Sequence, residues 1–126
     1  MKPIRTLLVD DSPEFLKSAA RFLAAQSRVD IVGQAHSACE ALELVSRLQP
    51  DLVLMDLRLP GLNGLEATRR LKASVQPPRV VILTLHDQAE YRRAATDAKA
   101  DGFIAKAELA VQLMPLIDRL FAPPSD

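Results

Sequence analysis

The sequence predicts an α/β protein: a doubly wound sheet of five parallel strands, with five helices distributed over its two faces. Short apolar segments alternate with longer segments of helical spacing, which is the pattern of a parallel sheet whose strands are joined by helices. Several of the short segments are near-continuous apolar runs, as expected for strands that are buried on both faces. The 126 residues suffice for one such domain.

The predicted strands are short and lie between helix-start or turn signals. They cover residues 6–9, 29–32, 52–55, 80–83 and 103–105. Residues typical of helix N-caps precede four of the predicted helices: Ser12 stands directly before Pro13, and Ser37, Asn63 and Asp87 each have a glutamate three residues later.

The predicted helices differ in their apolar faces. The first has a regular stripe, formed by Phe15, Leu16, Ala19, Phe22 and Leu23. The fourth, near residues 88–98, offers mainly alanines (Ala89, Ala94, Ala95 and Ala98), so we expect it to be weakly anchored. The fifth, residues 108–121, has more apolar residues than one core stripe needs. The excess belongs either to the core or to a partner surface, such as a homodimer contact through the fourth and fifth helices.

Composition and charge exclude several classes of function. Lysine plus arginine and aspartate plus glutamate each number 16, so this domain has no general electrostatic attraction to nucleic acid or anionic lipid. No apolar run approaches the roughly 18 residues that span a bilayer. One cysteine excludes an intrachain disulfide framework, and the N-terminus has no signal-peptide pattern. We therefore expect a cytoplasmic domain that binds neither membrane nor nucleic acid.

Polar side chains end four of the predicted strands. Asp10 and Asp11 follow the first strand, Asp56 the third, Thr84 the fourth and Lys106 the fifth. In a doubly wound sheet, ligands bind beyond the carboxyl ends of the strands. If the strand order is 2-1-3-4-5, these ends are neighbours. Three adjacent carboxylates repel one another unless one is protonated or a hard cation such as Mg²⁺ or Mn²⁺ binds.

Four segments together resemble the receiver domain of bacterial two-component response regulators. They are Leu-Leu-Val-Asp-Asp at 7–11, Leu-Met-Asp-Leu-Arg-Leu-Pro-Gly at 54–61, Val-Ile-Leu-Thr at 81–84 and Gly-Phe-Ile-Ala-Lys at 102–106. The resemblance covers nearly the whole chain. It implies the flavodoxin-like receiver fold with strand order 2-1-3-4-5, a receiver domain over residues 1–121, and a tail or linker start over residues 122–126.

The resemblance also implies a phosphoryl-transfer site. Asp56 would accept a phosphoryl group from a sensor histidine kinase or a phosphotransfer protein, because an aspartate can act as a covalent nucleophile. Asp10, Asp11, Asp56 and the backbone carbonyl of Arg58 would bind Mg²⁺ or Mn²⁺. Such a protein is a signalling phosphoacceptor that catalyses its own phosphorylation and dephosphorylation and turns over no metabolite.

Further roles follow from the same resemblance. Thr84 and Lys106 would bind the phosphoryl oxygens. Thr84 and Phe103 would be the switch residues that remodel the face formed by the fourth helix, the fifth strand and the fifth helix. Arg58 and His86 lie where side chains modulate the lifetime of the phosphorylated state, although His86 can equally be an exposed residue without a role.

The variant closest to this chain is the LuxR-type subgroup, whose members usually continue into a DNA-binding helix-turn-helix domain. The indications are Asp-Leu-Arg at 56–58, Thr-Leu-His-Asp at 84–87 and an alanine after Lys106. Lys99 stands where the subgroup often has glycine, so we expect a different turn there. The chain is either a stand-alone receiver or part of a longer transcription regulator, with Pro123 and Pro124 starting the linker.

Other functions compete with the phosphoacceptor. A phosphorylation-independent interaction module on the same fold is the main alternative, although such modules tend to lose part of the acidic pocket. A dehalogenase-type enzyme needs an acid two residues after its nucleophile, where this chain has Arg58. A flavin-binding protein is disfavoured because three clustered acids would repel the flavin phosphate.

Overall fold

Five parallel strands form one sheet over the part of the chain that the structure, a computed structural model, describes: residues 2–59, 61–85 and 88–121. The strands are β1 (Ile4–Val9), β2 (Val29–Ala35), β3 (Leu52–Asp56), β4 (Arg79–Thr84) and β5 (Gly102–Ala105). Their order across the sheet is β2-β1-β3-β4-β5, with every neighbouring pair parallel. The fold class and the strand order predicted above are confirmed.

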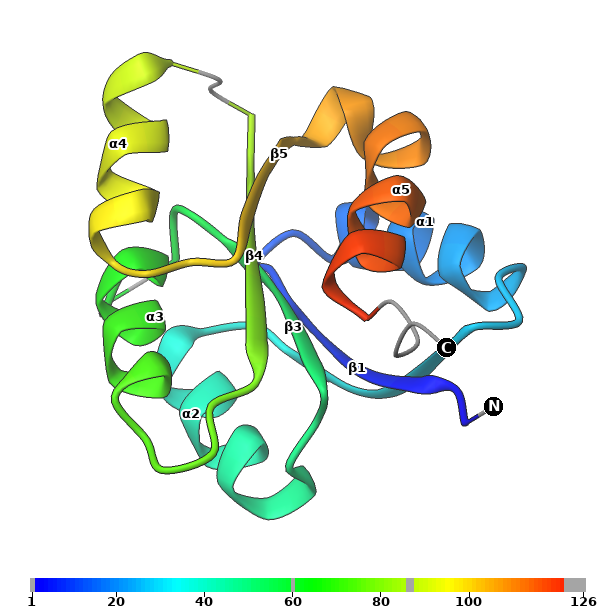
Figure 1. The fold of residues 1–126 in the computed structure, drawn as a ribbon, viewed down its shortest axis with the longest axis horizontal. Helices are drawn as coiled ribbons and strands as arrows, with labels where there is room; N and C mark the ends of the chain where they lie inside the picture. Colours follow the sequence, from blue (N-terminus) through cyan, green and yellow to red (C-terminus); the bar gives the residue numbers. More distant parts are fainter. Residues whose placement is uncertain (1, 60, 86–87, 122–126) are drawn as a thin grey trace, which may run out of the picture.

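The helices cover both faces of the sheet (Figure 1). They are α1 (Pro13–Ala24), α2 (Ala38–Leu48), α3 (Gly64–Lys72), α4 (Ala89–Asp97) and α5 (Leu109–Leu120), and a short 3₁₀ turn, η1 (Lys106–Glu108), precedes α5. Apolar residues of α1 and α5 pack with one set of strand residues. Those of α2, α3 and α4 pack with the alternate set. Successive strand residues point to opposite faces, so each strand supplies both cores.

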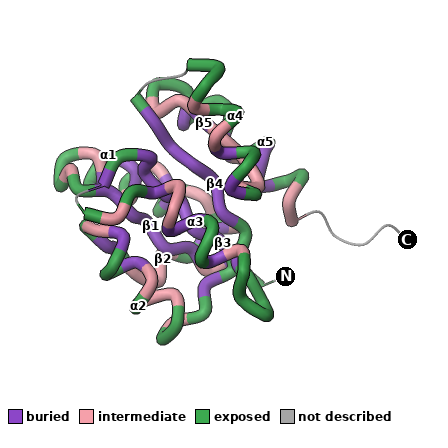
Figure 2. Tube along the Cα trace, turned by 90° about the vertical axis from the view of Figure 1, so that its left-hand side faces the viewer, coloured by how far each residue is buried: buried purple, intermediate pink, exposed green. Residues whose placement is uncertain are grey.

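Burial runs along the strands, and exposure is concentrated on loops and outer helix faces (Figure 2). In β3 every residue is buried, which explains why the strand reads as a continuous apolar run in the sequence. β2 extends three residues beyond the predicted segment. The reason is its ladder with β1, which pairs Leu7 with Gly33 and continues to Ala35 even though Gly33 and Gln34 carry no apolar signal.

Three predicted helix caps are confirmed. The side chains of Ser12, Ser37 and Asn63 accept hydrogen bonds from the backbone N–H three residues later, at 3.2, 3.1 and 2.9 Å. Each cap satisfies a backbone donor that the first helical turn leaves without an intrahelical partner. The fourth predicted cap, Asp87, lies outside the described residues.

The apolar excess of α5 lies mostly in the core. Leu109, Leu113, Leu116 and Ile117 are buried against the sheet, whereas Val111 is 70% exposed. α4 offers less to its core, since Ala95 and Ala98 are buried, Ala94 is half-buried and Ala89 is exposed. Two short side chains bury little apolar area, so weak anchoring of α4 stays our prediction.

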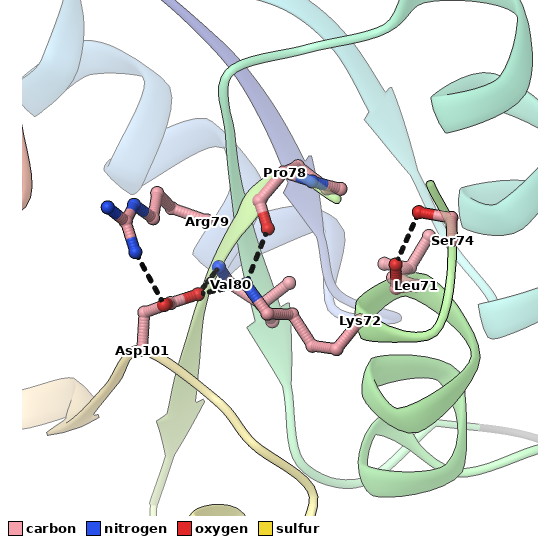
Figure 3. A network of polar contacts seen from close by, with 7 residues as sticks. All are labelled: Leu71, Lys72, Ser74, Pro78, Arg79, Val80 and Asp101. Carbon is pink, nitrogen blue, oxygen red and sulfur yellow. Dashed lines mark hydrogen bonds and ion pairs between the residues drawn. The ribbon is translucent and has the colours of Figure 1, made fainter. Parts of the chain in front are cut away.

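A polar network joins α3, β4 and β5 at the edge of the sheet opposite to the carboxyl ends of the strands (Figure 3). The Asp101 carboxylate accepts hydrogen bonds from Lys72 Nζ at 2.8 Å, from the Val80 backbone N–H at 2.8 Å and from Arg79 at 3.1 Å. Burial alone would raise the pKa of Asp101, but the Lys72, Val80 and Arg79 contacts together hold it below its ordinary 3.8. The carboxylate is thus fully paired and fixes the start of β5 to α3.

In the described part of the chain, no helix combines the length and apolar character that crossing a bilayer requires.

The chain after α4 turns through Lys99, which has a left-handed backbone with φ of 69°. Its N–H donates to the Thr96 carbonyl at 2.9 Å, and the Ala100 N–H donates to the Ala95 carbonyl at 3.0 Å, which together form a Schellman cap. The expectation of a different turn is therefore wrong. The hydrogen bonds impose the left-handed turn that glycine usually occupies, and Lys99 adopts it at an energetic cost.

We expect Lys99→Gly to raise the free energy of unfolding by about 1 kcal/mol, because glycine has no steric penalty at positive φ. Urea unfolding at equilibrium measures the change. Ala73→Gly is the matched control, since Ala73 ends α3 in the right-handed region with φ of −84°. Glycine at this position should destabilise the protein. If Lys99→Gly were less stable than the wild type, the statement that Lys99 is strained at its positive φ would be wrong.

Candidate functional site

The carboxyl ends of β1, β3, β4 and β5 bring the predicted polar residues to one edge of the sheet. Asp10 follows β1, Asp56 and Thr84 are the last residues of β3 and β4, and Lys106 follows β5. Asp10, Asp56 and Thr84 are among the few buried polar residues, with exposures of 1, 6 and 1%. A cluster of buried polar groups at a strand edge is costly unless the groups pair or bind a ligand.

Three carboxylates converge at this edge. Asp10, Asp11 and Asp56 each place an oxygen within 4.8 Å of the others, and Asp11 is the exposed member. The donor set consists of oxygen alone, which is what Mg²⁺ and Mn²⁺ prefer, and the open side at Asp11 leaves room for water and phosphoryl oxygens. The residues present therefore fit a hard divalent ion.

The Lys106 ammonium lies against two of these carboxylates. Nζ is 2.5 Å from Asp10 Oδ2 and 3.5 Å from Asp56 Oδ1, and the lysine side chain is 9% exposed. Asp10 accepts a second hydrogen bond, from the Ser12 backbone N–H to Oδ1 at 2.8 Å. Within the described cluster, three carboxylates thus face one ammonium, so two negative charges are left uncompensated when all three carboxylates are ionised.

Asp56 shows the consequence of this imbalance. Burial, followed by the neighbouring Asp10 charge, raises the pKa of Asp56 from 3.8 to about 6. The Lys106 charge and a hydrogen bond from the Arg58 backbone N–H act in the opposite direction, and Asp11 raises the pKa slightly further. The carboxylate of Asp56 is therefore held in its ionised form at neutral pH against a free-energy cost, which makes it receptive to a cation or an electrophile.

The backbone after β3 is fixed closely behind Asp56. The Leu57 N–H donates to the Leu83 carbonyl at 2.9 Å, and the Gly64 N–H donates to the Leu57 carbonyl at 3.1 Å. A Cβ atom at position 64 would overlap the backbone carbonyl of Asp56. Glycine at the first residue of α3 therefore allows the helix to begin directly against the end of β3.

Two contacts connect this site to α4. The Arg58 guanidinium donates to the Tyr91 hydroxyl at 3.0 Å, and the Arg92 guanidinium lies 4.8 Å from the centre of the Phe103 ring. Arg58 and Phe103 have roles predicted from the sequence, whereas Tyr91 and Arg92 were not predicted. Tyr91 is half-buried against the core of α2, α3 and α4, and Arg92 is exposed; neither belongs to a motif, so the sequence gives no signal for them.

The structure brings most of the predicted site residues together. Asp10, Asp11, Asp56 and Lys106 form one cluster, and Thr84 ends the strand next to Asp56. Phe103 pairs in register with Ile82, is half-buried and packs against the core that α2, α3 and α4 share. His86 lies outside the described residues.

The fold and this cluster of charged side chains define an α/β domain with an acidic, lysine-containing site at the carboxyl edge of its sheet. A family model described as the response regulator receiver domain matches residues 6–118. The chain belongs to this family, whose members serve two-component signalling.

Its relatives include LuxR-family regulators, as the subgroup motifs predicted. The chain is 36% identical to the response regulator GacA of Pseudomonas viridiflava over 94% of its length, and 35% identical to VraR of Staphylococcus saprophyticus over the same share. It spans about half of these relatives, 56 and 57%. A solved LuxR-family response regulator from Aurantimonas sp. SI85-9A1 superposes with a TM-score of 0.89 at 32% identity, covering 96% of this chain and 86% of that one.

We expect Asp56→Asn to stabilise the metal-free protein by about 3 kcal/mol at pH 7.5, because the amide removes a buried charge and its repulsion by Asp10. A raised carboxyl pKa means that the ionised group weakens the fold increasingly as the pH rises from 3.8 to about 6. The gain should therefore be full above pH 6 and absent below 3.8.

Thermal or urea unfolding in a chelator at several pH values measures this difference. Asp30→Asn, on the exposed outer strand β2, is the control and should show no comparable gain. If Asp56→Asn were less stable than the wild type at pH 7.5, the charge of the Asp56 carboxylate would be fully compensated by its neighbours and the expectation would be wrong.

Proposed function

We propose that this receiver domain is a phosphoacceptor switch in which Asp56 carries the phosphoryl group. The observation that supports it most directly is the cluster of three carboxylates with Lys106 Nζ between Asp10 and Asp56. A cluster with this charge balance needs a cation and tolerates an incoming phosphoryl group only when positive charge accompanies it. A phosphorylation-independent adaptor would have no need to keep all of these groups in an unfavourable arrangement.

The proposed reaction is an exchange of one bond for another. A carboxylate oxygen of Asp56 forms a bond to the phosphorus of a donor, in the cell a phosphohistidine of a sensor kinase or a phosphotransfer protein. The bond from phosphorus to the imidazole nitrogen breaks, and the imidazole leaves with the electron pair of that bond. The product on this chain is an acyl phosphate, which water later cleaves.

The chain's own residues would divide the supporting roles. Asp10, Asp11, Asp56 and the backbone carbonyl of Arg58 would hold Mg²⁺ or Mn²⁺, which when bound neutralises charge on the carboxylates and the phosphoryl oxygens. Lys106 would exchange part of its contact with Asp56 for a phosphoryl oxygen. Thr84, buried at the end of the adjacent strand, would donate its hydroxyl hydrogen to another phosphoryl oxygen.

We expect the wild-type protein to gain the mass of one phosphoryl group when it is incubated with Mg²⁺ and a small phosphodonor such as acetyl phosphate or phosphoramidate. Intact-protein mass spectrometry measures the gain. Chelation should prevent it, Asp56→Asn should abolish it, and Lys106→Ala should slow it by about 10- to 1,000-fold, because a charge directed at the phosphoryl oxygens is lost.

Asp30→Asn is the control and should behave like the wild type. If Asp56→Asn gained the same mass at the same rate, the phosphoryl group would be on another residue and the proposal would be wrong.

The output would pass through the face formed by α4, β5 and α5, which we propose as a homodimer surface. A pocket of about 680 Å³ lies there, with Arg92, Phe103, Val111, Pro115 and Arg119 in its lining. Val111 is 70% exposed on this face, and Phe103 connects the face to the phosphorylation site through its strand. Reorientation of Phe103 after phosphorylation would change the shape of this surface.

We expect Val111→Glu to weaken a phosphorylation-dependent dimer at least fivefold, because dimerisation would bury the introduced charge. Sedimentation velocity with and without phosphodonor measures the change. Val75→Glu is the matched control, since Val75 is 98% exposed after α3 and lines a different pocket. Unchanged sedimentation of Val111→Glu relative to the wild type would exclude this face.

A further inference from the structure

The Lys106 ammonium has a third neighbour, which is neither a carboxylate nor a hydroxyl. Nζ lies 4.3 Å from the centre of the Phe15 ring, over its face. Phe15 is the third residue of α1 and is half-buried against the core that α1 and α5 share. From the sequence it is one member of an apolar helix stripe. In the structure the same ring also borders the proposed phosphoryl-transfer site.

The ring is tied to the site through a short chain of contacts. Asp10 binds Lys106 through Oδ2 and the Ser12 N–H through Oδ1. The Ser12 hydroxyl in turn accepts the hydrogen bond from the Phe15 N–H at 3.2 Å, and Pro13 fixes the first helical position between them. The N-cap of α1 therefore sets the position of the ring relative to the carboxylate that holds the lysine.

An aromatic face suits this place for an electrostatic reason. A ring attracts an ammonium through its quadrupole but carries no net charge. A further carboxylate would hold Lys106 more strongly, yet it would cancel the positive charge that a phosphoryl group needs. The ring also replaces some of the water that a compact ammonium otherwise binds, which fits the 9% exposure of the lysine side chain.

We propose that Phe15 is a positioning residue for Lys106: its ring face directs the ammonium toward Asp56 without reducing its charge. The consequence for phosphoryl transfer rests on the proposed function above. The geometric part, the ring over the ammonium, stands on the contacts of this chain alone, so the two parts can be tested separately.

The first test is spectroscopic and needs neither metal nor phosphodonor. A proton above an aromatic face is shifted upfield by the ring current, so the ε-methylene protons of Lys106 should resonate upfield of those of exposed lysines. The signal is assigned by its loss in Lys106→Arg. Phe15→Tyr should keep the shift and Phe15→Leu should lose it. A Lys106 signal at the position of exposed lysines in the wild type would overturn the proposal.

The second test is kinetic. Phe15→Leu should phosphorylate about 3- to 30-fold more slowly with phosphoramidate and Mg²⁺, the range expected for loss of one cation–π contact, and Phe15→Tyr should restore the rate. Phe22→Leu is the matched control, because Phe22 packs on the same core from farther along α1. It should lower stability to a similar degree without changing the rate.

The outcomes separate this inference from the proposed function. Absence of phosphorylation in the wild type would refute the phosphoacceptor but leave the ring-current result to decide the position of Lys106. Phosphorylation of the wild type with an equal rate in Phe15→Leu would refute the role of Phe15 alone. Equal slowing in Phe15→Leu, Phe15→Tyr and Phe22→Leu would mean that the ring acts through packing, which also overturns the proposal.

Discussion

Repulsion among carboxylates at one edge of the sheet is the constraint on which the rest of this domain depends. The parallel topology places the ends of β1 and β3 side by side, so Asp10, Asp11 and Asp56 cannot separate without disrupting the core strands. One ammonium compensates part of their charge. The uncompensated charge contributes to the raised pKa of Asp56, and a bound cation is the natural means of relieving the repulsion.

The opposite edge of the sheet shows that this imbalance is not a general property of the fold. There, Asp101 is a single carboxylate that accepts hydrogen bonds from two cationic side chains and a backbone N–H, and its pKa is lowered. The same sheet thus has one edge with its charges paired and one with an excess of negative charge. The paired edge holds α3, β4 and β5 together, which keeps the carboxyl edge in place although its groups repel one another.

Local sequence patterns predict the strands and most helix starts of this fold. Apolar runs predict the strands, and Ser12, Ser37 and Asn63 predict where helices begin, because each cap acts over three residues. The strand order predicts that the polar strand ends meet, but contacts between individual side chains of other distant segments have no such pattern. The Phe15 ring contacts Lys106, although most of the sequence lies between the two residues. The left-handed turn at Lys99 likewise depends on hydrogen bonds that outweigh the preference of the residue itself.

The way α4 is attached to the rest of the domain bears on how a change at Asp56 reaches the surface. Its buried contribution is small, so we expect the core to hold α4 less firmly than it holds α1 or α5. Two consecutive residues nevertheless attach it to the site: Tyr91 to Arg58 beside Asp56, and Arg92 to Phe103 on β5. A helix held by polar and cation–π contacts more than by packing can shift when those contacts change. Such a shift costs less free energy than moving a strand of the buried sheet. The link from the carboxyl edge to the outer face would then act through side chains of α4, while the strands stay fixed.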